Sequence, residues 1–384
     1  MLGATFLIIS DEKIAEELLV KRAKIYSDRP EIRSLFDPKS TYGSMEYLPL
    51  MGRNKYWSRQ RRFTHAYLTK ATNNQYYGVM LFEVKRFLYR LVKNPDDFGF
   101  LLEDMASKIM CQLTWDDTSF SADENTINLS GDYEASSVIG MMALVGIFTV
   151  AGPLYYFLIA MVLHEDWLVK CQEEIDKNCN GRMPTLDDYP NLPILRACIL
   201  ETLRWKPNVP TGVAHELEVD DFYKGFFIAK GTRILPLDWA FLRNPEKYPD
   251  PENYHPERYL EPSWPTYGEP LTVYPTIKGL SSFGYGQRTC LGQSLTQDEL
   301  LVACGGLCWG FIMRKKIDPV TGREIEIDLQ ASNSLLIIKP DPFQMEFMPR
   351  TDVRKAEMIA QWELAEKKDL EERAAFLSDA VAGE

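Results

Sequence analysis

The sequence predicts a mainly α-helical protein with a small β region. Apolar residues recur at helical spacing along most of the 384-residue chain, whereas alternating, strand-like stretches are few and short. The stretch from Val138 to Leu163 contains no charged residue and is long enough for one continuous helix through the centre of a large domain. Because 45% of the residues are hydrophobic, the chain can bury a sizeable core around that helix.

Eight segments carry the helical pattern of apolar residues. They are 11–23, 55–70, 75–92, 98–113, 136–163, 165–179, 192–205 and 292–313. The first opens at Ser10 and Asp11, residue types that commonly cap helices. Three stretches have strand-like composition, at 4–9, 222–228 and 334–338.

The remaining segments are expected to be irregular or exposed. From Lys206 to Ser281 the chain is rich in proline and aromatic residues, which predicts a packed meander rather than disorder. Residues 121–134 are polar and form a short loop. The C-terminal segment is charged and rich in Ala, Glu and Lys, which predicts a solvated helix. We therefore expect a single domain over 1–350 and a charged helical tail over 351–384.

Composition excludes some classes of function. A net charge of −12 without a long basic run argues against general nucleic-acid binding. The seven cysteines are odd in number and lack zinc-finger spacing, so free thiols in a reducing compartment are expected. No signal-peptide pattern stands at the N-terminus. The stretch 138–163 also has the length of a membrane span. A fully buried central helix, bent at Gly152 and Pro153, is the favoured interpretation, and a membrane protein is the alternative.

One cysteine has unusual neighbours. Cys290 follows Gly284 and Gly286, which permit a tight turn, and Gly292 lets the next helix approach closely. The N-terminus of that helix would favour an anionic sulfur. Arg288, two positions before the cysteine, would bind carboxylates of the same ligand. A protected thiolate beside a dicarboxylate site matches the requirements of haem.

These residues carry a family resemblance. Phe283, Gly286, Arg288, Cys290 and Gly292 have the spacing F-x-x-G-x-R-x-C-x-G, which resembles the haem-binding signature of the cytochrome P-450 monooxygenases. The resemblance implies the cytochrome P-450 fold. It also implies iron protoporphyrin IX as cofactor, with Cys290 as the axial ligand of the iron and the other four residues around the haem.

Two further motifs support the resemblance. Glu201 and Arg204 form an E-x-x-R pair on one helix face, and Arg258 follows in Pro-Glu-Arg-Tyr. In the family such residues form a Glu-Arg-Arg network that holds the cysteine loop. Trp57 and Arg61 resemble the family's W-x-x-x-R motif, whose side chains contact a haem propionate.

His215 falls where the family often places another propionate donor, with an ordinary buried histidine as the alternative. Basic residues concentrate in one segment, where the resemblance implies docking of a reductase and a solvated helix face is the alternative. They are Arg53, Lys55, Arg59, Arg61 and Arg62. Because no flavin or dinucleotide motif is visible, electrons are expected from NADPH through a separate NADPH–cytochrome reductase.

The central stretch resembles the family's long helix above the haem. The alignment places Thr149 at the oxygen-activating threonine and Gly146 in the groove for dioxygen. The family usually has an acid immediately before that threonine, and here the position is Phe148. Its absence removes part of the expected proton relay. It therefore motivates an alternative function, a rearranging or peroxide-using haem enzyme.

The resemblance covers residues 4–350 with two departures. No N-terminal membrane anchor or proline-rich hinge is visible, and the loop 121–134 replaces the helices that normally roof the substrate pocket. The family implies the cytosolic face of the endoplasmic reticulum membrane, with the cytosol as alternative and possible membrane contact through 138–163. The missing lid motivates a further alternative, a non-catalytic truncated remnant or misassembled gene product.

The segment 206–215 resembles fungal enzymes of secondary metabolism. We therefore expect a haem-dependent monooxygenase that oxidises a small organic substrate, in fungal secondary-metabolite or mycotoxin biosynthesis.

Overall fold

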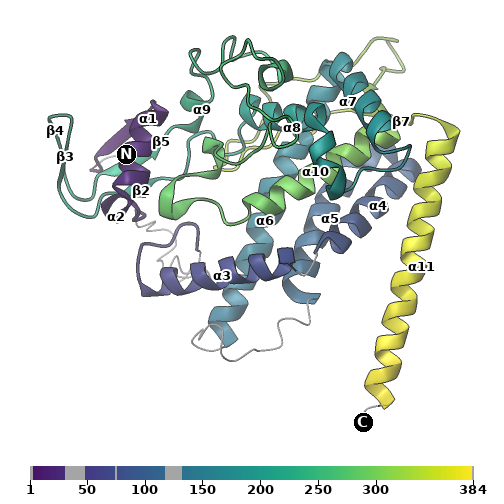
Figure 1. Ribbon diagram of the computed structural model, residues 1–384, viewed down its shortest axis with the longest axis horizontal. Helices are drawn as coiled ribbons and strands as arrows, with labels where there is room; N and C mark the ends of the chain where they lie inside the picture. Colours follow the sequence, from purple (N-terminus) through teal and green to yellow (C-terminus); the bar gives the residue numbers. More distant parts are fainter. Residues whose placement is uncertain (1–2, 31–47, 74–75, 117–131, 383–384) are drawn as a thin grey trace.

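A computed structural model describes residues 3–30, 48–73, 76–116 and 132–382 of the chain. Its α-helices are α1 (Glu12–Ala15), α2 (Ala23–Tyr26), α3 (Lys55–Asn73), α4 (Tyr77–Lys93), α5 (Phe98–Cys111), α6 (Asp132–Leu163), α7 (Glu165–Asn178), α8 (Pro193–Trp205), α9 (Asp238–Phe241), α10 (Gln293–Gly310) and α11 (Asp352–Ala382). A π-helical segment, η1 (Glu16–Lys21), joins α1 to α2. The mainly α-helical prediction is confirmed (Figure 1).

The described strands are short and lie in three small sheets. They are β1 (Phe6–Ile9), β2 (His215–Glu216), β3 (Asp221–Tyr223), β4 (Phe226–Ile228), β5 (Arg233–Pro236), β6 (Phe311–Lys315) and β7 (Met345–Pro349). Strand β5 pairs in parallel with β1 and antiparallel with β2, while β3–β4 and β6–β7 are antiparallel pairs. The first sheet lies beside α1 and α2, away from the main group of helices (Figure 1).

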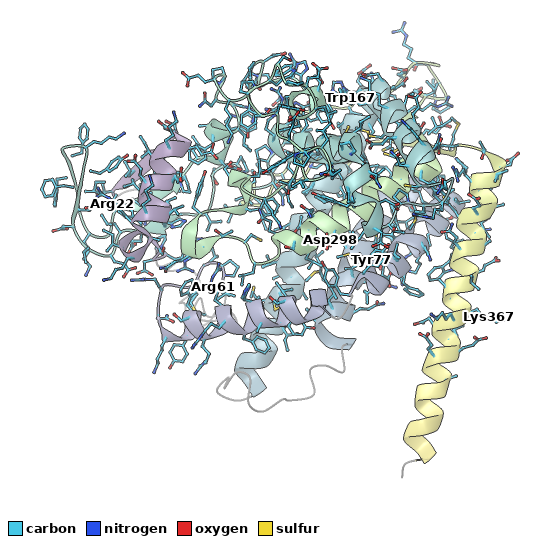
Figure 2. The ribbon with its side chains drawn as sticks, viewed as in Figure 1. Arg22, Arg61, Tyr77, Trp167, Asp298 and Lys367 are labelled. Atoms are coloured by element: carbon cyan, nitrogen blue, oxygen red, sulfur yellow. The ribbon has the colours of Figure 1, made fainter. Side chains whose placement is uncertain are left out.

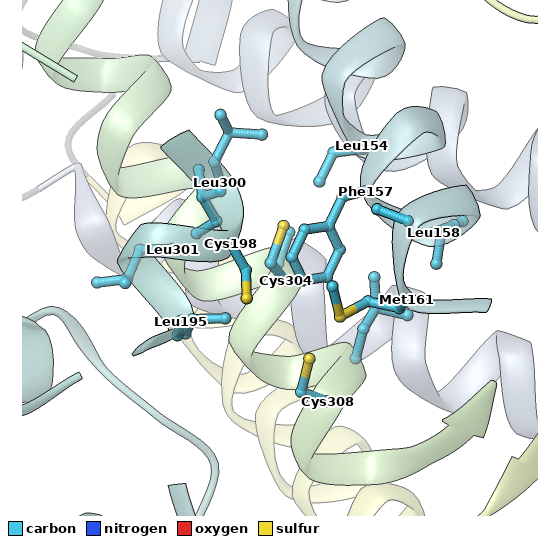
Figure 3. Close-up of a cluster of buried hydrophobic side chains, with 14 of the residues drawn as sticks. Leu154, Phe157, Leu158, Met161, Leu195, Cys198, Leu300, Leu301, Cys304 and Cys308 are labelled. Atoms are coloured by element: carbon cyan, nitrogen blue, oxygen red, sulfur yellow. The ribbon is translucent and has the colours of Figure 1, made fainter. Parts of the chain in front are cut away.

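The main core forms where α6 packs against its neighbouring helices. Phe157 and Met161 of α6 lie against Cys198 of α8 and against Cys304 and Cys308 of α10 (Figure 3). All these side chains are buried. Helices α5, α7, α8 and α10 pack on α6, and α4 packs on α5 and α10. The seven cysteines are free thiols, as expected, and no group of metal-ligating side chains occurs among the described residues.

The central helix differs from the sequence prediction in its burial. Val138–Leu163 is apolar and long enough to cross a membrane, with a mean hydropathy of 1.9, and 56% of its most apolar window is buried inside the protein. From Val150 onward the helix lies in the core, but Leu144 and Phe148 are 46% and 49% exposed. The prediction of a fully buried helix is therefore wrong for the middle of α6. Residues 117–131, which include most of the expected loop 121–134, lie outside the described residues. Residues 132–134 belong to α6, so the loop prediction is wrong for them.

Three local predictions are also wrong. The stretch 222–228 is not one strand but most of a hairpin, because Lys224 and Gly225 have φ angles of 50° and 86° and turn the chain back. The predicted helix 292–313 ends at Gly310, and its last residues belong to β6. No strand forms at 334–338, since the partner of β6 is β7.

The C-terminal helix is only partly solvated. Helix α11 extends away from the body of the protein (Figure 1), but its first turns pack on α4. The ring of Trp362 lies 5.1 Å from that of Phe82 and 6.1 Å from that of Tyr89, between centroids. Met358 and Trp362 are buried, whereas Leu364 and Leu370 are exposed. Hydrophobic burial therefore attaches the start of α11 to the domain.

Candidate functional site

The loop before α10 presents Cys290. It contains two short 3₁₀ turns, η9 (Ser281–Phe283) and η10 (Gly286–Arg288). The backbone N–H of Cys290 donates to the carbonyl oxygen of Phe283 at 2.7 Å and closes the loop. Gly286 has a φ of 54°, and a Cβ there would lie 2.3 Å from the carbonyl oxygen of Leu19, so only glycine fits. The loop is thereby fixed against η1.

Gly292 has a different role from the one expected. A Cβ on this residue would meet only the Cys290 sulfur, at an ordinary contact distance of 3.8 Å. Close approach of the helix therefore does not require glycine at this position. Its backbone N–H hydrogen bonds to the Cys290 thiol and lowers the pKa of that group.

The Cys290 thiol combines an exposed surface with a desolvated setting. The residue is exposed, whereas the other described cysteines are buried or half-buried. Burial by surrounding protein nevertheless raises the pKa of the thiol, and this effect exceeds the opposing influence of Gly292 and Arg61. The protein alone therefore does not stabilise the thiolate as the sequence suggested. A bound metal cation would complete the deprotonation, because coordinating thiols lose their proton.

A group of arginine side chains surrounds this loop. Arg61 of α3 donates from Nη2 to the carbonyl oxygen of Thr289 at 2.7 Å, and Figure 2 shows Arg61 next to the loop. Arg288 donates to Ser27 and Met51 carbonyls at 2.8 and 2.9 Å, and its guanidinium carbon lies 4.2 Å from the centroid of the Trp57 ring. Trp57, Arg61 and Arg288 are thus brought together as the sequence predicts.

Sequence reasoning missed a third arginine, Arg29. It is buried and donates from Nη1 to the carbonyl oxygens of Val213 at 2.8 Å and Ala214 at 2.7 Å. Burial, with Arg288 and Arg61 nearby, lowers the pKa of Arg29 to about 9. No local motif marks this residue. In the sequence, Arg29 is distinguished only by its position after the first helical segment.

The arginine cluster has the properties of an anion site. Burial also lowers the pKa of Arg288 to about 10, and its Nη1 atom is buried without a hydrogen-bond partner. Within the described part of the chain, no carboxylate forms an ion pair with Arg29, Arg61 or Arg288. Buried positive charge of this kind is costly unless an anion neutralises it. The two carboxylates of a haem would supply that neutralisation, so the residues fit the cofactor.

His215 lies beside the same cluster. It is buried in β2, and its Nδ1 lies 2.8 Å from the carbonyl oxygen of Tyr26. Since a carbonyl can only accept, Nδ1 carries the proton. Burial and the neighbouring Arg29 lower the pKa of His215 to about 3, so the ring is neutral at pH 7. In that state Nε2 is an acceptor, so the expected donation to a propionate requires the ring to take up a second proton, which a neighbouring anion would favour.

The Glu-Arg-Arg network forms as predicted, in full burial. Arg204 donates from Nε and Nη2 to the two carboxylate oxygens of Glu201, both at 2.8 Å, and Arg258 donates from Nε at 3.1 Å. None of the three side chains is accessible. Other N–H groups of Arg204 and Arg258 donate to backbone carbonyl oxygens of the meander, between Leu242 and Asn253. The network therefore fixes the meander to α8, and its hydrogen bonds do not reach the Cys290 loop directly.

Thr149 occupies the middle of α6 and is half-buried. Its hydroxyl donates to the carbonyl oxygen of Val145 at 2.8 Å. Phe148, in the position of the expected acid, is exposed. A Cβ on Gly146 would lie 2.5 Å from the sulfur of Met110, so the side chain of Met110 fills the groove expected there. Among the described residues, the hydrogen bonds of Thr149 go to Val145 and Asn208 and none reaches the cysteine loop.

Comparisons with known proteins agree with this geometry. The family model described as Cytochrome P450 matches residues 117–311. The chain is 26% identical to cytochrome P450 monooxygenase virE of Hypocrea virens, over 94% of this chain and 81% of virE. It is 38% identical to cytochrome P450 monooxygenase psoD of Aspergillus fumigatus, over 53% of this chain and 39% of psoD. The virE alignment extends over 447 positions, more than the whole chain, so virE contains segments without a counterpart here.

The fold is also similar to solved structures. A zebrafish cytochrome P450 determined with abiraterone superposes with a TM-score of 0.72 at 20% identity, covering 90% of this chain and 94% of that protein.

Proposed function

This chain belongs to the cytochrome P450 family, and from that premise we propose that it is a haem-thiolate monooxygenase acting on a small organic molecule in fungal secondary metabolism. One observation carries the assignment. The exposed residue Cys290 lies beside the buried Arg29 and Arg288 and the half-buried Arg61, none of which forms an ion pair with a carboxylate of the described chain. A thiolate ligand next to a site for two carboxylates is the arrangement that haem requires.

The residues of the site have distinct roles in this proposal. Cys290 would ligate the iron as a thiolate, and the charge of Arg61 and the N–H of Gly292 would help the thiol lose its proton. Arg29, Arg61 and Arg288 would neutralise the propionates, and Phe283 and Gly286 shape the loop. When bound, the haem supplies the oxygen chemistry of the family.

In this proposal, Thr149 of α6 would position a water molecule. Its hydroxyl donates its only proton to Val145, which leaves its lone pairs to accept from water. Because Phe148 replaces the acid, α6 supplies no carboxylate between Val138 and Leu163 for proton transfer. That observation supports a second candidate function, a haem-thiolate enzyme that rearranges its substrate or uses peroxide.

A redox partner would dock on the basic face of α3. Of the five basic residues in this segment, Arg53 pairs with Glu218 at 2.7 Å and Arg61 binds the cysteine loop. Lys55 and Arg62 are exposed, so these two would form the electrostatic contact with an NADPH–cytochrome reductase. For location, we propose the cytosolic face of the endoplasmic reticulum membrane, with the exposed part of α6 available for contact.

A spectroscopic experiment tests the assignment. Purified protein is incubated with hemin, reduced with dithionite and exposed to carbon monoxide. We expect the red-shifted Soret band of thiolate ligation, and its loss in Cys290→Ala. Cys111→Ala, which removes a half-buried thiol on α5, is the matched control and should keep the band. Failure of the wild-type protein to take up hemin would overturn the assignment.

The second candidate is tested with reductase and NADPH. If the protein is a monooxygenase limited by proton supply, Phe148→Asp should increase the fraction of NADPH consumed that appears as oxidised product. Unchanged NADPH consumption and product formation in Phe148→Asp would remove the proton-relay argument for the second candidate. Product formation without NADPH would favour the rearranging or peroxide-using enzyme. Haem uptake without turnover under any of these conditions would instead favour the non-catalytic remnant.

A further inference from the structure

A buried carboxylate holds the start of the cysteine loop. Asp238, the first residue of α9, is 3% exposed. The hydroxyl of Ser281 donates to its Oδ1 atom, and that of Ser282 donates to its Oδ2 atom at 2.6 Å. No lysine or arginine of the described chain forms an ion pair with Asp238, since Lys247 pairs with Glu12 and Arg243 with Glu252. The two serine hydroxyls are therefore its principal polar partners.

These two serines lead directly to the bond that fixes Cys290. They belong to η9, whose last residue is Phe283. The carbonyl oxygen of Phe283 accepts the backbone N–H of Cys290 at 2.7 Å, and that of Ser281 accepts the N–H of Gly284 at 2.9 Å. Movement of Ser282 would displace Phe283 and hence this hydrogen bond.

Asp238 is itself attached to other parts of the fold. The N–H of Leu237 donates to the carbonyl oxygen of Ile9 at 2.9 Å, and the N–H of Trp239 donates to that of Pro210 at 2.8 Å. These bonds join α9 to β1 and to the segment after α8. The hydrogen bonds of the Glu201 network end at meander residues between Leu242 and Asn253. Asp238, another residue of the meander, makes the hydrogen bonds to the cysteine loop.

We propose that Asp238 is a positioning residue that holds the Cys290 loop, and through it the sulfur, in the orientation for ligating haem iron. The proposal rests on the proposed function. Asp238 acts through Ser281 and Ser282 and does not touch the cofactor.

The charge state of Asp238 is consistent with this role. Burial raises its pKa to about 6, while hydrogen bonds from Ser281 and Ser282 oppose the shift. Two charged groups add weaker and opposite effects, Glu12 raising the pKa and Lys247 lowering it. At neutral pH the carboxylate is therefore ionised and accepts from both hydroxyls.

The test compares haem retention in variants that remove either end of the contact. The variants are Asp238→Ala, the double variant Ser281→Ala with Ser282→Ala, and the triple combination. Readouts are the rate of haem transfer from the ferric protein to apomyoglobin and the fraction of the carbon monoxide complex with the thiolate spectrum. Each variant removes hydrogen bonds to a charged carboxylate. We therefore expect the rate of haem transfer to increase roughly tenfold relative to wild type. The thiolate fraction should fall in parallel.

Two comparisons separate positioning from general destabilisation. The triple variant should lose haem no faster than Asp238→Ala, because all the substitutions remove one contact. The control is Asp188→Ala, since Asp188 is also buried and accepts a hydroxyl, that of Thr185 at 3.0 Å, together with Arg182. This control should lower thermal stability and leave haem transfer unchanged. The milder Asp238→Asn and Ser282→Ala give the same readouts if Asp238→Ala does not fold.

The outcomes are distinguishable from failure of the proposed function. If wild-type protein binds no hemin or shows no thiolate spectrum, the function itself is wrong. If wild-type protein does both and the Asp238 and serine variants behave like it, only the positioning role is wrong. Equal acceleration of haem transfer in Asp188→Ala would also overturn that role, because the effect would then follow stability alone.

Discussion

The side-chain amide of Asn208 donates to the backbone carbonyl oxygen of Thr149 at 3.1 Å. In a regular helix that carbonyl would accept the N–H of residue 153, but residue 153 is Pro153, which has none. Asn208, from the segment after α8, therefore satisfies the acceptor that the proline leaves open. It does so at the residue proposed to position water, and Gly152 makes room, since a Cβ there would lie 2.3 Å from Asn208 Oδ1.

Asn208→Ala should destabilise the protein by about 1–3 kcal/mol, because a half-buried carbonyl loses its donor. In a Pro153→Ala background the same substitution should cost much less, since an alanine in place of the proline restores the helical N–H. Denaturant unfolding of the four proteins measures this coupling. Asn178→Ala is the control, because Asn178 makes a similar bond to the carbonyl of Asn191 at the surface. Equal costs of Asn208→Ala in both backgrounds would contradict the pairing.

Arg61→Ala should raise the pKa of Cys290 further in the haem-free protein. The positive charge of Arg61 lowers that pKa, against the larger effect of burial. The rate of alkylation by iodoacetamide as a function of pH measures it, because the thiolate is the reacting form. Cys290 should therefore react more slowly at pH 8 in Arg61→Ala. Arg62→Ala, an exposed neighbour on α3, should leave the profile unchanged.

Glu201→Ala should destabilise the protein by about 3–5 kcal/mol, because it leaves two buried guanidinium groups without their carboxylate. Both Arg204 and Arg258 are inaccessible and bind Glu201. The exposed pair Lys367–Glu371 provides the comparison, and Glu371→Ala should cost less than about 1 kcal/mol. Denaturant unfolding of both variants measures these costs, which appear as shifts of the midpoint without a change in the slope of the transition. Similar costs for the two substitutions would argue against the buried network.

Glu299 of α10 predicts a pH dependence of stability. It is fully buried, neither carboxylate oxygen has a hydrogen-bond partner, and burial raises its pKa to about 8 from the ordinary value of 4.5. Between these values the unfolded chain is ionised at this site and the folded protein is not. Stability therefore falls as the pH rises from about 4.5 to 8 and this contribution is constant above that range.

Glu299→Gln removes the ionisation. Relative to wild type, its free energy of unfolding should increase by roughly 2–4 kcal/mol between pH 5 and pH 8. Denaturant titrations at pH 5, 6, 7 and 8 measure the difference. Glu326→Gln, at an exposed glutamate, should run parallel to wild type over this range. A Glu299→Gln curve that is also parallel would show that the carboxyl is ionised in the folded state.

Trp362→Ala should detach α11 from α4. The indole is buried against Phe82 and Tyr89, so its removal should cost about 3–5 kcal/mol if α11 unfolds cooperatively with the domain. Leu364→Ala, two residues further along and 72% exposed, should be nearly neutral. Thermal unfolding followed by circular dichroism distinguishes the two. A small cost for Trp362→Ala would mean that α11 behaves as the independent tail expected from its sequence.

A large part of the fold and of the site could be predicted from the local spacing of residues in the sequence. The cysteine loop could be predicted because its glycine, arginine and cysteine positions act within ten consecutive residues. Glu201 and Arg204 could be paired because one helical turn separates them. Most helices were predicted because apolar periodicity directly reflects which helix face is buried.

Tertiary structure decided the rest, because it depends on residues distant in the chain. Arg29 carries no local motif and becomes part of the site only where the first sheet meets the cysteine loop. The five basic residues around α3 look alike in sequence, and only packing directs Arg61 inward and leaves Lys55 and Arg62 exposed. The link from Asp238 to Ser281 crosses more than forty residues. A sequence pattern indicates which residues can be buried or charged. Their partners are determined only when segments that are distant in the chain pack together and form hydrogen bonds.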